Sequence, residues 1–166
     1  MGLADFSFAV VEGDLETSKD ADRLRAKGIA AVQIQTGSAC HLDAFMVHDG
    51  LHDLPLDGVD VCFVENVGNL VCPASYDVGT HLNIVLVSIP EGEDKIAKYP
   101  VMFRQADLIL FTKTDLLPYF EYNIEAEKAE ARRIKPNVDI LELSTKEPAS
   151  VQAVVDWINF KRKMRA

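Results

Sequence analysis

Short apolar runs recur along this chain at fairly regular intervals, and helix-compatible stretches lie between several of them. The runs are rich in Val, Ile, Leu and Phe and occupy residues 6–13, 30–37, 59–66, 83–90, 108–115 and 139–146. The helix-compatible stretches occupy residues 20–27, 40–54, 122–135 and 148–163. Near-continuous apolar strands that alternate with helices are typical of a mostly parallel sheet. The pattern therefore predicts a doubly wound α/β fold with helices on both faces of the sheet.

The size and charge of the chain limit the classes of protein to which it can belong. With 166 residues, 48% of them hydrophobic, and no internal repeat or linker-like tract, the sequence predicts a single domain over residues 1–166. The formal net charge of -9 argues against binding to nucleic acid or to an anionic membrane through a basic surface. No apolar run approaches the roughly 20 residues that span a bilayer, and the first residues do not resemble an export signal. We therefore expect a cytoplasmic protein.

Polar side chains follow each predicted strand. In an open α/β sheet the ligand-binding crevice lies outside the carboxyl ends of the strands, so these residues are the candidates for a functional site. The residues at or just after these strand ends include, in chain order, Asp14, Cys40, His41, Glu65, Asn66, Gly68, Cys72, Lys95, Lys113, Asp115 and Ser144.

The element TKTD at 112–115 closes the fifth predicted strand with a lysine and a carboxylate. The Asp115 carboxylate can accept two hydrogen bonds from the N1 and exocyclic amine groups of guanine, while the Lys113 stem packs on the base plane. Adenine presents the opposite donor and acceptor pattern, so a carboxylate here discriminates between the two bases. The element resembles the N-K-x-D motif of GTPases, with Thr112 where Asn is usual. An ordinary solvated loop is the alternative interpretation.

The third predicted strand ends in Glu65 and Asn66, and Gly68 follows. A carboxylate at a strand end with a glycine after it is the general form of a Walker-B and switch region. There the acid reaches a magnesium shell, and the glycine amide can meet a terminal phosphate. Cys62 lies inside this strand and is interpreted as a small buried hydrophobic residue. Cys72 lies in the loop beyond, where that interpretation is less satisfactory.

The chain has three cysteines, Cys40, Cys62 and Cys72, and no export signal. An odd number of cysteines in such a chain argues against a disulfide framework, so reduced thiols are expected. Cys40 and His41 are adjacent, and their side chains would diverge by about 100° on a regular helix. A shared metal therefore needs them at an irregular helix start, for which Ser38 is a candidate cap.

Two thiolates and an imidazole suit zinc or nickel, and three protein ligands leave at least one coordination position open for exchange. The residues themselves leave two interpretations of the adjacent Cys40 and His41: a metal site, or ordinary core residues with a surface histidine. The remaining histidines, His48, His52 and His81, are interpreted as surface or loop residues, although His48 or His52 could act as a distant ligand.

Three motifs occur together and in order: GSACHLDA at 37–44, ENVGNLVCPA at 65–74 and EGEDK at 91–95. With them the chain resembles, from about residue 8 to its end, the HypB family of GTP-binding nickel-insertion accessory proteins for NiFe hydrogenase maturation. The resemblance implies that Cys40, His41 and Cys72 ligate nickel or zinc near a nucleotide-dependent dimer interface. It also implies a homodimer that works with the hydrogenase large subunit and other nickel-insertion accessory proteins.

The same resemblance assigns a site for GTP and magnesium. Asp14 and Glu65 would be the catalytic residues beside the magnesium and the phosphates. The residues implied in binding the nucleotide are Asn66, Gly68, Lys95, Lys113 and Asp115, with Lys113 and Asp115 on the guanine and Lys95 near the nucleotide of the partner subunit. The implied mechanism is a switch in which GTP joins two subunits and its hydrolysis moves the loop that carries Cys72.

One motif of such GTPases is absent from the 166 residues, the phosphate-binding loop G-x-x-x-x-G-K-[ST]. We therefore expect an N-terminally shortened member of the family, with a P-loop NTPase-like core that lacks its first strand, loop and helix. Loss of this loop removes most phosphate contacts but leaves metal ligation untouched. Whether the chain hydrolyses GTP to GDP and phosphate, and so is an enzyme, stays open. The alternatives are a non-hydrolysing metal-binding module and an inactive fragment.

Overall fold

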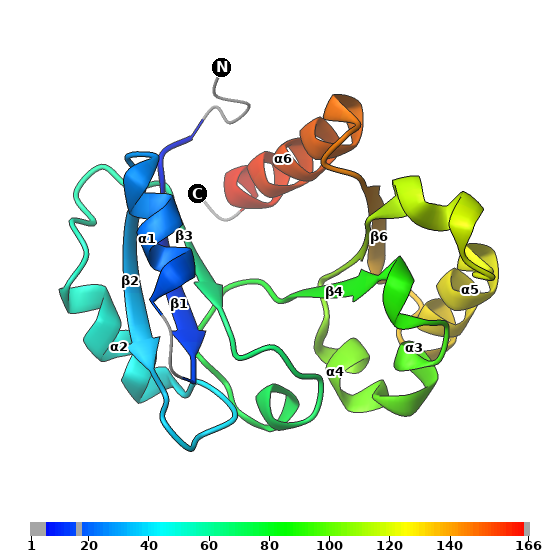
Figure 1. Ribbon diagram of the computed structural model, residues 1–166, viewed down its shortest axis with the longest axis horizontal. Coiled ribbons are helices and arrows are strands. Elements are labelled where there is room, and N and C mark those ends of the chain that lie inside the picture. The colour runs from blue at the N-terminus through cyan, green and yellow to red at the C-terminus, as the bar shows by residue number, and fades with distance from the viewer. Residues whose placement is uncertain (1–5, 16–17, 165–166) are drawn as a thin grey trace. The chain divides into compact units, whose positions relative to one another are not determined.

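The computed structural model describes residues 6–15 and 18–164. This part of the chain forms two compact units, one within residues 6–81 and the other within residues 82–164, and both are drawn in Figure 1. Each strand in the described part overlaps one of the predicted apolar runs, and its pairings with neighbouring strands are parallel. The predicted α/β fold, with parallel strands and covering helices, is therefore confirmed.

The first unit is built on a three-stranded parallel sheet in the order β2-β1-β3. Its strands are β1 (Phe8–Asp14), β2 (Ala30–Gln35) and β3 (Val61–Glu65). Parallel strands need crossover connections, and these contain α1 (Lys19–Ala26) and α2 (Ala44–His52). A 3-10 helix, η1 (Cys72–Ser75), follows β3.

The two faces of this sheet bury different side chains, because successive residues of a strand point to opposite faces. On one face, Val10 of β1 packs with Ala31 of β2 and Ala21 of α1. On the other face, Val11 of β1 packs with Leu51 of α2 and with other apolar residues after that helix. The two helices therefore cover opposite faces of the sheet, as Figure 1 shows.

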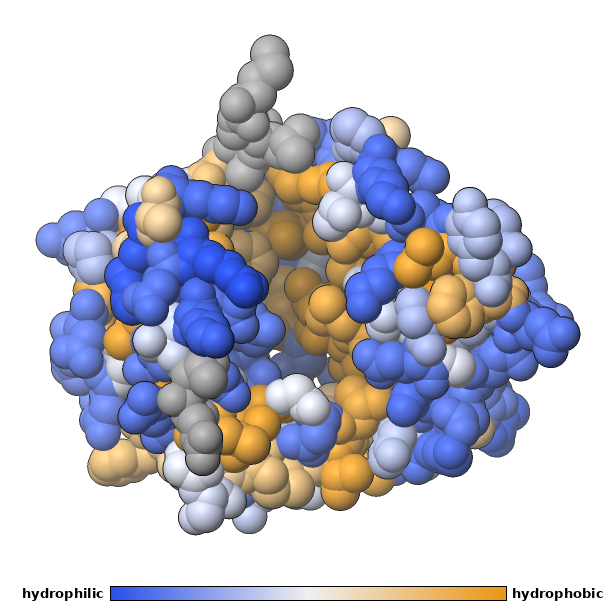
Figure 2. All heavy atoms as spheres, viewed as in Figure 1, coloured by the Kyte–Doolittle hydropathy of each residue, from blue (hydrophilic) through white to orange (hydrophobic). Residues whose placement is uncertain are grey.

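The outer surface of α1 carries charges of both signs. Asp20 pairs with Arg23 at 2.7 Å, and Asp22 pairs with Arg25 at 2.5 Å. In Figure 2 hydrophilic side chains cover the α1 segment. Exposed ion pairs of this kind contribute little to stability. The helix is therefore held to the sheet mainly by its buried apolar residues.

The second unit contains a parallel sheet in the order β4-β5-β6. Its strands are β4 (Ile84–Ser88), β5 (Leu108–Thr112) and β6 (Asp139–Leu143). Its helices are α3 (Lys95–Lys98), α4 (Pro100–Gln105), α5 (Ile124–Ile134) and α6 (Pro148–Lys163), with 3-10 helices η2 (Ile89–Glu91) and η3 (Thr114–Tyr119). None of the helices in residues 6–15 and 18–164 is long and apolar enough to cross a membrane.

The start of α2 differs from the prediction. The helix predicted at 40–54 begins only at Ala44, so Cys40 and His41 lie in the irregular segment before it. The expectation that Ser38 caps this helix is wrong, because the cap is Asp43, whose carboxylate accepts a hydrogen bond from a backbone N–H of the first turn at 2.8 Å. The single domain over residues 1–166 and the absent first strand stay predictions.

Candidate functional site

The carboxyl end of the β2-β1-β3 sheet carries a row of polar side chains on the face that α1 covers. Glu12 of β1 lies in register with Gln33 of β2 on one side and with Glu65 of β3 on the other. Two residues earlier in β1, Val10 occupies the same face in an apolar cluster. The face therefore changes from apolar to polar where the parallel strands end, which is where ligands bind in open α/β sheets.

A cavity of about 180 Å³ adjoins this row. The residues that line it are Glu12, Gly13, Asp14, Asp20, Gln33, Glu65, Asn66 and Gly68. Four of these side chains carry a carboxyl group, and none of the described residues in the lining is Lys or Arg. A site of this composition attracts a cation, or a ligand rich in hydrogen-bond donors.

The electrostatics of the cavity favour the same kind of ligand. Burial raises the pKa of the Glu12 carboxyl, and the charges of Glu65 and Asp20 raise it further. Burial also raises the pKa of Glu65, and Asp20 adds to that shift. Neighbouring carboxylates in a poorly solvated site destabilise one another's charged forms. A bound cation relieves this repulsion and restores the charged forms.

The Gln33 side chain has unused hydrogen-bonding capacity inside this cavity. Both polar atoms of its amide are buried, and neither has a hydrogen-bond partner among the described residues. A buried unpaired polar group costs about 1–3 kcal/mol, and such groups are rare. Because Gln33 lines the cavity, its amide is available to a ligand or an ordered water there. Nothing in the local sequence marks Gln33 as a candidate, since only the strand register shows that it stands beside Glu12.

Asn66 connects the cavity to the segment that carries His41. The Asn66 Oδ1 atom accepts a hydrogen bond from the backbone N–H of Leu42 at 2.8 Å. Leu42 directly follows His41, is fully buried, and packs so close to Gly13 that a Cβ added there would lie 2.6 Å from its Cγ. Both Asn66 and Gly13 line the cavity. The polar cavity and the His41 segment are therefore in direct contact.

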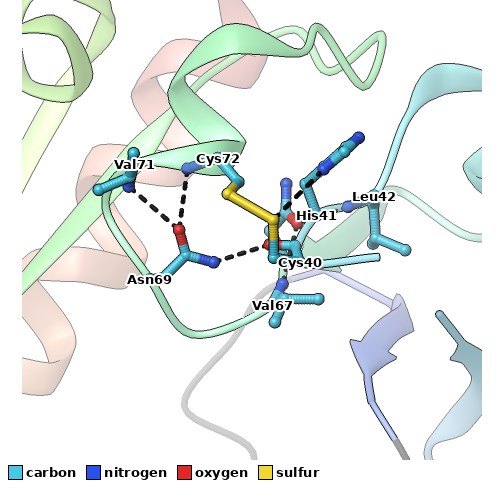
Figure 3. Close-up of a disulfide and its surroundings, with 8 residues drawn as sticks. Cys40, His41, Leu42, Val67, Asn69, Val71 and Cys72 are labelled. Atoms are coloured by element: carbon cyan, nitrogen blue, oxygen red, sulfur yellow. Dashed lines mark hydrogen bonds between the residues drawn. A yellow bond between two sulfur atoms is a disulfide. The ribbon is translucent and has the colours of Figure 1, made fainter. Parts of the chain in front are cut away.

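A disulfide joins Cys40 and Cys72, which are 32 residues apart in the sequence (Figure 3). Their Cα atoms lie 6.1 Å apart, because the loops after β2 and β3 converge at the same edge of the sheet. The expectation of reduced thiols is therefore wrong for these two cysteines. It holds for Cys62, a free and half-buried thiol in β3. Burial raises the pKa of the Cys62 thiol, which keeps it protonated and poorly reactive.

His41 lies beside the disulfide and contacts the same second loop. Its Nδ1 atom is 3.9 Å from the Cys40 Sγ atom. Its ring stacks on Tyr76, with the ring centroids 3.5 Å apart and the planes 13° apart. Tyr76 directly follows η1 and therefore belongs to the loop that carries Cys72. The structure thus brings Cys40, His41 and Cys72 into one cluster.

Asn69 holds the two cysteine loops together. Its side-chain Nδ2 atom donates a hydrogen bond to the Cys40 carbonyl oxygen at 2.7 Å (Figure 3). Its Oδ1 atom accepts hydrogen bonds from the backbone N–H groups of Val71 at 3.1 Å and of Cys72 at 2.9 Å. An asparagine that accepts from residues shortly after it forms an Asx-type turn, for which the stretch NLVC is a usable signal. The bond to Cys40 has no such signal in the sequence.

The chemistry of these donors fits two different ions. Two thiols and an imidazole suit nickel or zinc, but sulfur ligates as a thiolate, so the disulfide must first be reduced. As it stands, the described part of the chain has no group of three or more His, Cys, Asp or Glu side chains arranged to hold a metal. Magnesium commonly uses only one or two carboxylates, with water and phosphate oxygens as its other ligands. Asp14 and Glu65 of the cavity fit that pattern.

The second unit has its own polar site at the carboxyl end of β5. Asp115, in η3, accepts a hydrogen bond from the Ser144 hydroxyl at 2.8 Å and pairs with the Lys146 ammonium at 2.7 Å. The Lys146 contact, and after it the Ser144 hydrogen bond, hold the pKa of the Asp115 carboxyl below its usual range. Ser144 is fully buried and fixes the carboxylate, whereas the Lys146 side chain is largely exposed. Lys113 has a positive φ of 60°, which turns the chain from β5 into η3.

The residues predicted from the sequence therefore fall into three local groups. Asp14, Glu65, Asn66 and Gly68 line the acidic cavity. Cys40, His41 and Cys72 form the adjoining cluster in the same unit. In the second unit, Lys113 and Asp115 follow β5, and Lys95 is the first residue of α3.

Known proteins match this chain over most of its length. A family model described as the CobW/HypB/UreG nucleotide-binding domain matches residues 3–142. The hydrogenase/urease maturation factor HypB of Helicobacter hepaticus is 51% identical over 162 residues, which cover 95% of this chain and 67% of that protein. The hydrogenase maturation factor HypB of Escherichia coli is 46% identical over 154 residues, which cover 93% of this chain and 53% of that protein. The chain thus spans between about half and two thirds of the length of these curated relatives.

Solved structures agree with the sequence matches. A crystal structure of HypB from Helicobacter pylori in complex with nickel superposes with a TM-score of 0.93 and 43% identity, covering 97% of this chain and 77% of that one. A crystal structure of HypB from Archaeoglobus fulgidus superposes with a TM-score of 0.86 and 35% identity, and the match covers 95% of this chain and 77% of that one. Fold, sequence and family model point to the same relatives. The chain therefore belongs to the HypB family of CobW/HypB/UreG nucleotide-binding domains.

Proposed function

We propose that this chain is a GTP-dependent nickel carrier that serves NiFe hydrogenase maturation. The observation that carries the proposal is the cluster of Cys40, His41 and Cys72, whose sulfur and imidazole donors match the preference of nickel. A related HypB has been crystallised in complex with nickel. The proposal includes a cytoplasmic homodimer that acts with the hydrogenase large subunit and other nickel-insertion accessory proteins.

Reduction of the disulfide by a dithiol, which is itself oxidised to a disulfide, would supply the two thiolates that bind the cargo. With the His41 imidazole they provide three protein ligands for Ni(II) or Zn(II) and leave a position open, which suits an ion that must be handed on. Asn69 holds the backbones of both cysteines by hydrogen bonds. The stack with Tyr76 fixes the orientation of the His41 ring. These contacts would lower the cost of ordering the three ligands once the disulfide is reduced.

The acidic cavity would hold the magnesium of the nucleotide. Bound there, magnesium would neutralise charge at the phosphates, where GTP would be converted to GDP and phosphate. Asp14 and Glu65 provide carboxylates for this role, and Asn66 and Gly68 stand beside them in the lining. The match to a nucleotide-binding domain supports the assignment.

Guanine would be recognised in the second unit by Lys113 and Asp115. Ser144 is buried and holds one oxygen of the Asp115 carboxylate in place. The ion pair with the exposed Lys146 is of the weak, solvent-screened kind and can yield to the base. Lys95 at the start of α3 would meet the nucleotide of the partner subunit in the dimer.

Asn66 would couple the nucleotide to the nickel. Its side chain lines the acidic cavity, and its oxygen accepts from the Leu42 N–H, one residue after His41. A ligand that draws the Asn66 side chain toward the phosphates would lengthen this hydrogen bond and release the His41 segment. The affinity for nickel would then depend on the bound nucleotide. This dependence corresponds to a coupling free energy between the two sites, which a carrier needs.

Calorimetric titration of the reduced chain with Ni(II), with and without GTP and magnesium, tests this proposal. The affinity of the wild type is expected to change with GTP. Asn66→Ala is expected to bind nickel with an affinity that no longer responds to GTP, whereas Asn66→Asp keeps an acceptor for the Leu42 N–H and retains the response. Equal affinity of the wild type for nickel with and without GTP would contradict the GTP-dependent mechanism and would indicate a passive metal-binding module.

A further inference from the structure

Two histidines on α2 form a pair rather than two separate surface residues. His48 and His52 are four positions apart, so their side chains lie on the same face of the helix. Their Nε2 atoms are 3.2 Å apart, and the two ring planes are 88° apart. Both residues are exposed to solvent. The Nε2 atoms of two imidazoles therefore lie close together on an accessible surface.

The separation of the two nitrogens fits one metal ion. An ion about 2.1 Å from each Nε2 atom would subtend an angle of about 100° between them, which lies between the octahedral and tetrahedral angles of about 90° and 109°. Imidazole nitrogens suit nickel, zinc and copper, whereas magnesium and calcium prefer oxygen ligands. Without a metal, the same distance allows one neutral ring to donate a hydrogen bond to the other.

The helix that carries the pair packs closely on the sheet. Val47 and Gly50, on another side of α2, are buried. A Cβ added at Gly50 would lie 2.9 Å from the Ile34 Cδ1 atom, so the helix backbone packs closely on β2. A pair of ligands on a fixed helix loses little freedom when an ion binds.

The local charge also favours a cation. His52 is the last residue of α2, where the partial negative charge of the helix C-terminus stabilises positive charge. Asp49 and Asp53 each follow one of the histidines, and both are exposed. Their carboxylates raise the local concentration of cations around the pair.

We propose that His48 and His52 form a second transition-metal site, which binds Ni(II) or a similar divalent ion through the two Nε2 atoms. Solvent water completes the coordination, so the ion exchanges readily. This inference does not rest on the proposed function, because it needs neither the thiols of Cys40 and Cys72 nor a nucleotide. It assigns the chain a metal site that survives oxidation of the cysteines.

Titration of the oxidised chain with Ni(II) removes both thiolates from the measurement, and substitution of the histidines separates their contribution from that of the carboxylates in the acidic cavity. The oxidised wild type is expected to bind Ni(II) saturably in a non-coordinating buffer, and so is His81→Gln, a matched control at an exposed histidine outside both sites. His48→Gln and His52→Gln are each expected to lose this binding. Glutamine is a good helix former, so the variants keep α2, and circular dichroism checks that they do.

Two results would overturn the inference. One is the absence of Ni(II) binding by the oxidised wild type, and the other is unchanged binding in the His48→Gln/His52→Gln double variant. A failure of the proposed function would give a different result. The reduced chain would then bind nickel in a way that does not depend on Cys72 or on GTP, and the titration of the oxidised chain would be unaffected.

Discussion

Asn69 ties Cys40 to Cys72 through the backbone. Its side chain donates to the Cys40 carbonyl oxygen at 2.7 Å and accepts from the Cys72 N–H at 2.9 Å. The two cysteines are 32 residues apart, and their loops leave different strands. Hydrogen bonds of this kind orient the ligands in metal sites, and their loss typically lowers the affinity for the metal by about 10–100-fold. Asn69 is thus a positioning residue for the proposed nickel ligands.

We expect Asn69→Ala to weaken Ni(II) binding by the reduced chain by about 10–100-fold, because both cysteine loops lose their common anchor. Competition with a coloured chelator measures the affinity. Asn69→Asp keeps the acceptor for the Cys72 N–H and loses only the bond to Cys40, so its effect should be smaller. Unchanged affinity for Ni(II) in Asn69→Ala would show that Asn69 does not position the nickel ligands.

Gly13 and Gly68 line the same cavity but should respond differently to an added methyl group. A Cβ at Gly13 would lie 2.6 Å from the Cγ atom of the fully buried Leu42, whereas a Cβ at Gly68 would meet no atom of the described chain within 4 Å. Overpacking of a buried contact costs about 1–3 kcal/mol. We expect Gly13→Ala to lower the free energy of unfolding by that amount in urea denaturation, and Gly68→Ala to leave it nearly unchanged. Equal stability of the two variants contradicts the packing described.

Glu127 in α5 makes the stability of the second unit depend on pH. Its side chain is buried, one of its carboxylate oxygens has no hydrogen-bond partner among the described residues, and burial together with the charge of Glu93 raises its pKa to about 7. The ordinary value of 4.5 applies to the unfolded chain. Between pH 4.5 and 7 the folded state therefore binds more protons than the unfolded state, and stability falls as the pH rises through this window.

The variant Glu127→Gln should remove the part of this fall that Glu127 causes. At pH 8, where the wild type carries the full cost of a buried charge, the variant should be more stable by up to about 3 kcal/mol. Urea denaturation at pH 5 and pH 8 measures the difference. Glu121→Gln, which changes an exposed carboxyl just before α5, should leave the pH dependence intact. A wild type that is equally stable at both pH values contradicts the prediction.

Asp115→Asn should change which base is preferred. The asparagine amide offers a donor where the carboxylate offered only acceptors, so the guanine N1 and exocyclic amine groups lose their partner. Xanthine, which has a carbonyl oxygen in place of the amine, should gain affinity relative to guanine. Displacement of a fluorescent guanine nucleotide by GTP, XTP and ATP measures this order. Retention of the guanine preference in Asp115→Asn would show that the base binds elsewhere.

Residues at the ends of strands were predictable from the sequence, because a parallel sheet gathers the carboxyl ends of its strands at one edge. Asp14 directly follows one apolar run and Glu65 lies at the end of another, and both line one cavity in the structure. Gln33 lies within a strand, and its role follows only from the register that sets it beside Glu12. Register depends on pairing between distant segments, which a single run of residues does not determine.

The cysteine cluster marks the limit of reasoning from local pattern. The number of cysteines predicted reduced thiols, yet Cys40 and Cys72 meet because the loops after β2 and β3 converge. The helix start was misplaced for a related reason. Both Ser38 and Asp43 are good capping residues, and the choice of Asp43 leaves Cys40 and His41 outside α2. That irregular segment is what allows the two adjacent side chains to face one site.

The most direct test of the account is nickel X-ray absorption spectroscopy of the reduced chain loaded with less than one equivalent of Ni(II). We expect a coordination shell that contains the sulfur atoms of Cys40 and Cys72 and an imidazole, and a loss of sulfur scattering in Cys72→Ser. A shell of nitrogen and oxygen alone in the wild type, or an unchanged shell in Cys72→Ser, would contradict the claim that this cluster carries the metal.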